Sequence, residues 1–129
     1  MKKAATIAQM LVRVSGVILI VLGALFWTGN ALSLIPVHML FGLVLVLSLW
    51  TLAYLAYRQG VNTGLVLLAV VWGLVVPILG VTQQQLAPGP AHWTIQVLHL
   101  LVGLGAIGQS ESLGARIKAS EGQRVEAPR

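Results

Sequence analysis

The sequence predicts an all-α integral membrane protein built as a bundle of four transmembrane helices. Two observations indicate this class. Of the 129 residues, 57% are hydrophobic and only 9% are charged, which is too apolar for a single water-soluble core. The apolar residues also gather in four long stretches. Each stretch comes near the ~20 residues that a helix needs to cross ~30 Å of hydrocarbon, and none alternates like a barrel strand.

The first two helices are bounded by aromatic residues and a proline. The first is expected over about 8–28 and ends beside Trp27, which suits the membrane interface. The second is expected over about 34–58. Pro36 marks its start, and Tyr57 is an interfacial anchor near its end.

The last two helices follow turn signals. Asn62 can cap a third helix over about 63–82, in which Pro77 should introduce a bend. A Pro-Gly-Pro run at 88–90 makes a stiff turn before the fourth helix, expected over about 91–112.

The chain is expected to divide into two parts. Residues 1–112 form the bundle. After Leu113 the sequence becomes small and polar, so residues 113–129 are expected to form a flexible cytoplasmic tail.

Glycine and tryptophan inside the apolar stretches predict tight helix packing. Small residues let membrane helices approach closely. Trp50 and Trp72 lie deeper than interfacial anchors and are expected to pack between helices. The glycines expected at helix contacts are Gly16, Gly23, Gly73, Gly80, Gly103, Gly105 and Gly108.

The basic residues predict the orientation. All eight Lys and Arg lie before or within the start of the first stretch, in the second connection at Arg58, or after the fourth stretch. By the positive-inside rule, both termini face the cytoplasm, as expected in a prokaryotic plasma membrane. A sequence pI near 10.5 then indicates attraction to anionic lipid, because the dispersed charges lack a nucleic-acid-reading module.

The absence of cysteine excludes several kinds of site. Structural disulfides, thiolate metal sites, iron–sulfur clusters and thioether-attached haem all need cysteine. Lys2 and Lys3 ahead of an apolar run suggest a signal peptide. No small-residue cleavage pattern follows Trp27, however, so the first helix is expected to be retained.

All three histidines lie toward the predicted outer side, and two share a pattern. His38 and His99 are followed four residues later by Gly42 and Gly103, which lie on the same helix face one turn along. A histidine at membrane depth is costly and needs a partner. The glycine leaves bare backbone beside the imidazole, as a flat macrocycle held between two helices requires.

Depth is compatible with a facing pair. His38 is twenty residues from Arg58 and His99 is seventeen from Arg116, so their heights agree within ~5 Å at the helical rise of ~1.5 Å per residue. If the fourth helix ends earlier, His92 matches His38 instead. His99 is preferred as the second ligand because only it has the following glycine, but the choice between His92 and His99 stays open.

Two histidines without cysteine or an acidic cluster fit a b-type haem better than zinc or a di-iron centre, which need further ligands. The sequence therefore predicts one haem b per chain. His38 and His99 would be its ligands, Gly42 and Gly103 would make room beside them, and His92 would bond a haem propionate or a quinone oxygen. For His92 alone, a plain packing or interfacial role is the preferred interpretation.

The order of these residues resembles one four-helix half of haem A synthase, or a similar small four-helix membrane b-type cytochrome. Segments 36–42 (PVHMLFG) and 95–101 (IQVLHLL) carry the resemblance, which spans about residues 10–110. That family has two tandem halves, and a half can hold haem between histidines of its second and fourth helices. Here a tandem half is missing, and 29–35 lacks the acidic and cysteine residues associated with the synthase chemistry. A homodimer could supply the missing half.

Three functions are compatible with these features of the sequence. The preferred one is a small b-type cytochrome that passes single electrons, with quinone or another redox partner, or carries haem. The second is a non-catalytic accessory or scaffold subunit whose glycine faces dock other helices. A proton-coupled transporter is disfavoured, because acids are missing from the apolar stretches and only Pro77 interrupts a helix.

Overall fold

The structure, a computed structural model, describes residues 1–126, and nearly all of this part is helical. The four predicted helices are confirmed, and a short 3₁₀ helix lies in each of the first and third connections. The elements are α1 (Lys2–Trp27), η1 (Leu32–Leu34), α2 (Ile35–Arg58), α3 (Thr63–Thr82), η2 (Gln83–Gln85) and α4 (His92–Glu126).

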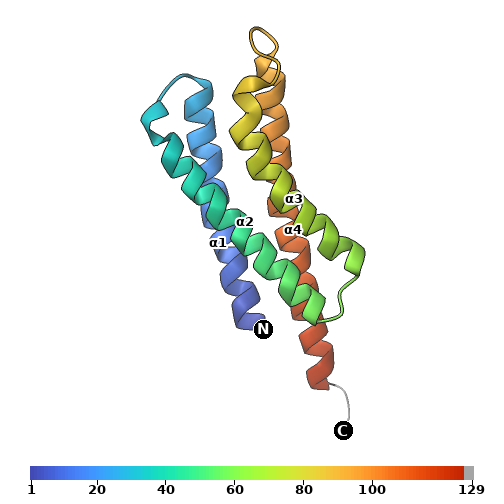
Figure 1. Ribbon diagram of the computed structural model, residues 1–129. Coiled ribbons are helices and arrows are strands. Elements are labelled where there is room, and N and C mark those ends of the chain that lie inside the picture. The colour runs from blue at the N-terminus through green and yellow to red at the C-terminus, as the bar shows by residue number, and fades with distance from the viewer. Residues whose placement is uncertain (127–129) are drawn as a thin grey trace.

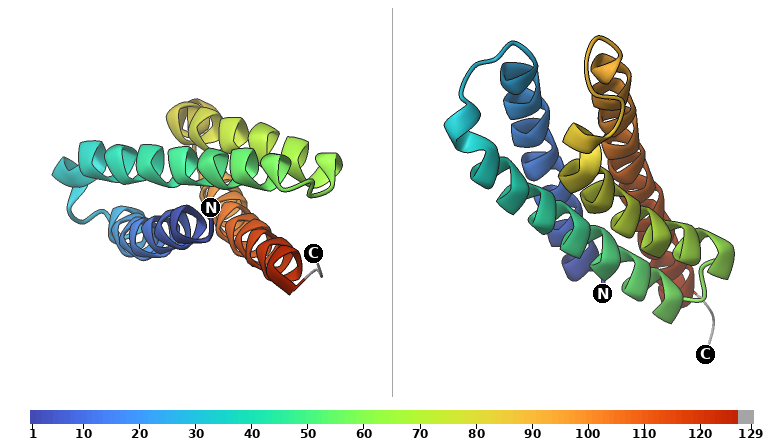
Figure 2. Two further views of the ribbon diagram at one scale, coloured as in Figure 1. Left: turned by 90° about the horizontal axis from the view of Figure 1, so that it is seen from below. Right: turned by 45° about the horizontal axis from the view of Figure 1, so that its top comes forward.

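The helices form two antiparallel hairpins, α1–α2 and α3–α4, which lie side by side (Figure 1). α2 packs against α3 and α1 against α4, whereas α1 and α3 do not contact each other within residues 1–126. Seen from below, α2 and α3 form one layer and α1 and α4 the other (Figure 2, left). In Figure 1 the hairpins diverge toward the end that carries η1 and η2.

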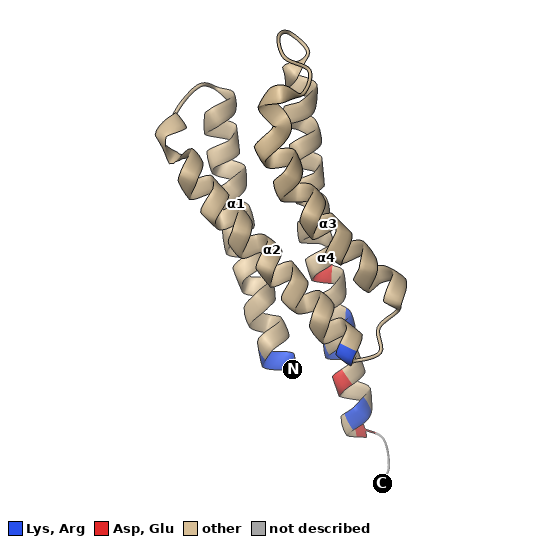
Figure 3. Cartoon of the chain, in the orientation of Figure 1, with Lys and Arg blue, Asp and Glu red and all other residues tan. Residues whose placement is uncertain are grey.

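Charge divides the bundle into two ends. Figure 3 shows Lys, Arg and Glu gathered toward the end with the N-terminus and the α2–α3 connection, which we name the charged end. The opposite end, with η1 and η2, is tan throughout, and we name it the uncharged end. The side of a membrane that each end faces is a prediction, taken up below.

Three segments are long and apolar enough to cross a membrane: α1, α2 together with η1, and α3 together with η2. By length and composition the chain is therefore a multi-pass membrane protein. α4 is not among the three, because polar residues such as Gln96, His99 and Gln109 interrupt its apolar residues. A fourth span stays a prediction.

The buried core lies toward the charged end. Its largest fully enclosed apolar side chains are Val12, Leu45, Leu49, Leu52 and Ile117. By contrast, residues 35–44, 74–82 and 92–101 contain no buried side chain. The parts of α2 and α3 near the uncharged end are thus less enclosed than the rest of these helices, whereas α4 lacks buried side chains at both ends, in 92–101 and in 118–126.

Two tryptophans join neighbouring helices, as the sequence predicted. The Trp50 indole packs directly on Gly73 of α3, and its Nε1 donates to a backbone carbonyl of that helix at 3.2 Å. Trp72 Nε1 donates to the Val102 carbonyl of α4 at 2.8 Å, and its ring lies against Gly105. In both pairs the missing glycine Cβ makes room for the ring.

A polar cluster joins α1 to α4 near the charged end. Arg13 donates from Nε and Nη2 to the two carboxylate oxygens of Glu111, at 2.7 and 2.8 Å. Gln9 Nε2 donates to the same carboxylate at 3.1 Å, and Lys118 Nζ donates to Gln9 Oε1. The Gln9 side chain fits because Gly114 has no Cβ.

The fourth helix is longer than the sequence predicted. Residues 113–126, expected as part of a flexible tail, are helical, and residues 127–129 lie outside the described residues. Leu113 and Ile117 are four residues apart on one helix face, and both are buried in the core. The amino terminus also pairs with Glu121 at 3.4 Å. These contacts explain how a polar segment continues the helix.

Candidate functional site

The most distinctive polar feature near the uncharged end is a pair of imidazoles from different hairpins. His38 lies in the first turn of α2, and His99 lies two turns into α4. Their ring centroids are 6.3 Å apart and their planes are inclined by 43°. Both side chains are half-buried. The structure thus brings together the two histidines that sequence analysis paired.

A glycine of the partner helix in the same hairpin lies beside each ring. A Cβ on Gly23 of α1 would lie 3.9 Å from His38 Cε1, and a Cβ on Gly80 of α3 would lie 3.2 Å from His99 Cε1. Phe26 of α1 also contacts His38, with ring centroids 5.4 Å apart. Each ring is therefore positioned by the other helix of its own hairpin.

The sequence predicts Gly23 and Gly80 at helix contacts, and nothing in it shows that each lies beside a histidine. The spacing within one helix cannot show this relation, because each glycine and its histidine lie on different helices. The antiparallel pairing of the hairpins, with both residues near the same end, is the signal that was missed.

Gly42 and Gly103 differ from Gly23 and Gly80 in what surrounds them. A Cβ at either position would meet no protein atom outside its own helix backbone within 4 Å. Both are one turn from a histidine, on the same face. Bare backbone beside each imidazole therefore borders open space rather than a neighbouring helix.

The ring nitrogens lack protein partners. Nδ1 of His38 and Nδ1 of His99 are each enclosed by protein, with no hydrogen-bond partner among residues 1–126. Buried polar atoms are normally hydrogen-bonded, and leaving one without a partner costs free energy. The same holds for the side-chain oxygens of Gln59 and Gln109, so the unpartnered Nδ1 atoms mark the pair as costly to bury without identifying a ligand.

The separation of the rings can be compared with metal geometry. A transition metal binds an imidazole nitrogen at about 2 Å, and the ring centre lies about 1 Å further, so imidazoles on opposite sides of one metal have centroids about 6 Å apart. A tetrahedral site would bring the centroids to about 5 Å. The separation of 6.3 Å between His38 and His99 is close to the value for opposed imidazoles, and it is also an ordinary distance between packed aromatic rings.

No further protein ligand accompanies the pair. Within residues 1–126 there is no group of three or more His, Cys, Asp or Glu side chains that could hold a metal ion. Any metal between His38 and His99 must therefore bring most of its own ligands. A macrocyclic cofactor such as haem, which carries its own ring nitrogens, would meet this requirement.

His92 lies apart from this pair. It begins α4, seven residues before His99 on the same face, and its Nδ1 is 3.2 Å from the Leu86 carbonyl oxygen of the preceding loop. The structure places His99, not His92, in ring contact with His38. Gln96 lies between His92 and His99 on this half-buried face.

Comparison of the chain with protein-family models, with curated proteins and with solved structures finds no match. The chain is therefore assigned to no family. The resemblance to half of a haem A synthase stays a prediction that rests on segments 36–42 and 95–101.

Proposed function

We propose that this chain is a b-type haem protein of a prokaryotic plasma membrane, in which His38 and His99 would hold one haem per chain near the outer leaflet. The pair of rings is the observation that carries the proposal. The rings come from different hairpins, lie 6.3 Å apart and have no third metal-binding side chain beside them in the described residues. A haem supplies the remaining four nitrogens from its porphyrin.

The surroundings of the pair suit a flat, largely apolar ligand. Gly42 and Gly103 border open space one turn from each histidine, and Phe26 contacts the His38 ring. Gly23 and Gly80 allow both imidazoles to lie close to the partner helix. Packing of each ring against the helix backbone at these glycines would fix its position. The region between the hairpins would then be left for the ligand.

A bound haem would supply one-electron redox chemistry, and the chain would bind it, orient it and restrict water. Ligand identity, nearby hydrogen bonds and low polarity set the potential of such a site. Two imidazoles and an end without Lys, Arg, Asp or Glu are the groups of this chain that would set the potential. We therefore propose electron transfer, with quinone or another redox partner, or haem carriage. His92 would donate to a propionate or a quinone oxygen.

We further propose that α4 is a fourth span and that both termini are cytoplasmic. α4 packs along all three candidate spans and runs antiparallel to α3. Its polar residues His92, Gln96 and His99 are half-buried, and polar groups in membrane helices usually face the bundle interior. The basic residues gather at the charged end, which by the positive-inside rule is the cytoplasmic one.

A homodimer would supply the second half that haem A synthase contains. Native mass spectrometry of the purified protein should then show a dimer, and a spectrum containing only monomer would contradict this part of the proposal.

One observation favours a second function, an accessory or scaffold subunit without cofactor. Gly42, Gly103 and Gly108 border open space, and bare glycine backbone in a membrane helix is a common site for docking another helix. This alternative requires no haem, so cofactor content separates the two.

The test is the absorption spectrum of protein purified from haem-replete cells. The proposal predicts a Soret band and, after reduction, the sharp α and β bands of a low-spin b-type haem. A colourless preparation that takes up no added haem would overturn it and favour the scaffold.

A further inference from the structure

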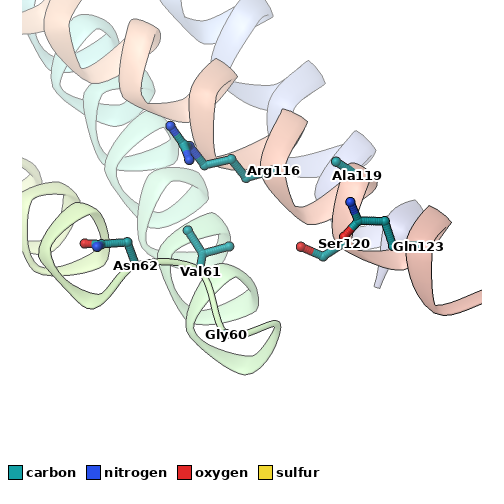
Figure 4. A pocket seen from close by; sticks show the side chains of 7 residues that line it. All are labelled: Gly60, Val61, Asn62, Arg116, Ala119, Ser120 and Gln123. Atoms are coloured by element: carbon teal, nitrogen blue, oxygen red, sulfur yellow. The ribbon is translucent and has the colours of Figure 1, made fainter.

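A second polar site lies at the charged end, far from the histidines. It is a recess of about 310 Å³ between α4 and the α2–α3 connection. Figure 4 shows Arg116, Ser120 and Gln123 along one face of α4, across from the connection. The residues that line the recess are Gly60, Val61, Asn62, Arg116, Ala119, Ser120 and Gln123.

The polar side chains of the recess supply hydrogen-bond donors without a carboxylate. Arg116 contributes a guanidinium group, Ser120 a hydroxyl, and Gln123 and Asn62 amide groups. The Asn62 oxygen is already used, because it accepts from the Gly64 N–H at 2.8 Å. In Figure 4 the Asn62 side chain points away from α4, so Arg116, Ser120 and Gln123 of α4 are the donors of the recess.

Arg116 has no acidic partner among residues 1–126. In the part of the chain that the structure describes, its only side-chain hydrogen bond is from Nε to Ser112 Oγ, at 3.4 Å. Two of the nearby carboxylates are turned toward α1, where Glu111 binds Arg13 and Glu121 pairs with the amino terminus. The guanidinium therefore contributes an uncompensated positive charge to the recess.

The recess lies at the edge of the apolar surface. α2 ends at Arg58 and α3 begins at Thr63, so the connection between them marks the end of two candidate spans. Within two turns along α3, Leu67 and Leu68 are exposed and present an apolar surface to the hydrocarbon. An amphiphile whose headgroup fills the recess could lay its acyl chains on this surface.

We propose that the recess binds the negatively charged phosphate of an anionic phospholipid headgroup. Arginine binds phosphate strongly through charge-assisted hydrogen bonds, and basic pockets on the cytoplasmic side of membrane proteins hold such headgroups. The adjoining apolar surface favours a lipid over free phosphate. This site does not depend on haem binding.

The test is lipid retention by the full chain in mild detergent, measured by native mass spectrometry with phosphatidylglycerol or phosphatidylcholine added. The wild-type chain should retain phosphatidylglycerol preferentially. Arg116→Gln should lose this preference, and the matched variant Arg124→Gln, which removes a charge from the same helix outside the recess, should keep it. Circular dichroism checks that Arg116→Gln is folded, and Ser120→Ala should weaken retention without removing a charge.

Two results would overturn the proposal. Equal retention of phosphatidylglycerol by the wild type and Arg116→Gln would show that Arg116 binds no headgroup. Displacement of the lipid by millimolar inorganic phosphate, with no preference between the two lipids, would identify a free-anion site instead. The haem spectrum should be unchanged in Arg116→Gln, so failure here is distinguishable from failure of the haem proposal.

Discussion

The imidazoles of His38 and His99 come from different hairpins, and their centroids lie 6.3 Å apart although the residues are 61 positions apart in the chain. Each ring lies beside a glycine of its own hairpin, and neither Nδ1 has a partner in the described residues. This relationship makes the pair, rather than either histidine alone, the candidate site.

Replacing either member of the pair should abolish low-spin haem binding. Because removal of a group that merely orients a ligand costs about 10–100-fold in metal affinity, loss of the ligand itself should cost more. His38→Ala and His99→Ala should therefore lack the sharp reduced α band in purified protein. His92→Ala is the control and should keep most of it. If His99→Ala keeps the reduced α band and His92→Ala loses it, the second ligand is His92 rather than His99.

Filling the space beside the histidines should block the ligand and leave the fold intact. Gly42→Leu adds a side chain where a Cβ would meet no described atom within 4 Å outside its own helix backbone, so a stable, folded chain with much less bound haem is expected. Gly108→Leu is a matched control, since its Cβ would also meet nothing within 4 Å and it lies further from the pair. The haem-to-protein ratio is measured for both purified variants. Equal ratios in Gly42→Leu and Gly108→Leu would argue against a ligand beside Gly42.

A methyl group at Gly73 should destabilise the bundle. Its Cβ would overlap the Trp50 indole, which must then move and loosen its hydrogen bond to α3. Overpacking of this kind costs about 1–3 kcal/mol. Gly108→Ala should have little effect. The free energy of unfolding in mild detergent is measured for both variants. If Gly73→Ala lowers this free energy less in a Trp50→Phe background than in the wild type, the two positions are coupled.

The absence of cysteine allows a direct test of orientation. Single-cysteine variants Ser33→Cys and Gln84→Cys place a thiol at the uncharged end, and Gly122→Cys places one at the charged end. In intact cells stripped of any outer barrier, a membrane-impermeant maleimide should label the first two and spare Gly122→Cys until lysis. Labelling of Gly122→Cys alone in intact cells would contradict the predicted topology and place the charged end outside.

Much of the fold follows from the sequence, because long apolar stretches bounded by turns leave few alternatives. The second and third helices, expected over 34–58 and 63–82, occupy Ile35–Arg58 and Thr63–Thr82, and Asn62 caps the third as predicted. The first helix begins earlier than expected, at Lys2, because Ala5 and Ala8 pack in the core. Alanine is only weakly hydrophobic, so the hydropathy of this segment does not indicate that it belongs to the helix.

The end of α4 was mispredicted for a related reason. Its last part is polar on average, and the average hides Leu113 and Ile117, whose spacing of four residues forms an apolar contact with the core. Gln9 and Gly114 add a second contact that sequence alone cannot pair, because the two residues lie on α1 and α4.

The site was predictable only in part. Within each helix, the four-residue spacing from histidine to glycine identified His38, His99 and the bare backbone beside them. The rest depends on contacts between helices, such as Gly80 against the His99 ring, and such contacts leave no pattern in one segment. The preference for His99 over His92 beside His38 also depends on how far α4 extends and rotates.

The most direct test of the central claim is a titration of haem into the purified chain in detergent, followed at the Soret band. The account predicts saturation at one haem per chain and a reduced spectrum typical of two imidazole ligands, both lost in the His38→Ala, His99→Ala double variant. Unsaturable binding, or a wild-type spectrum identical to that of the double variant, would contradict it.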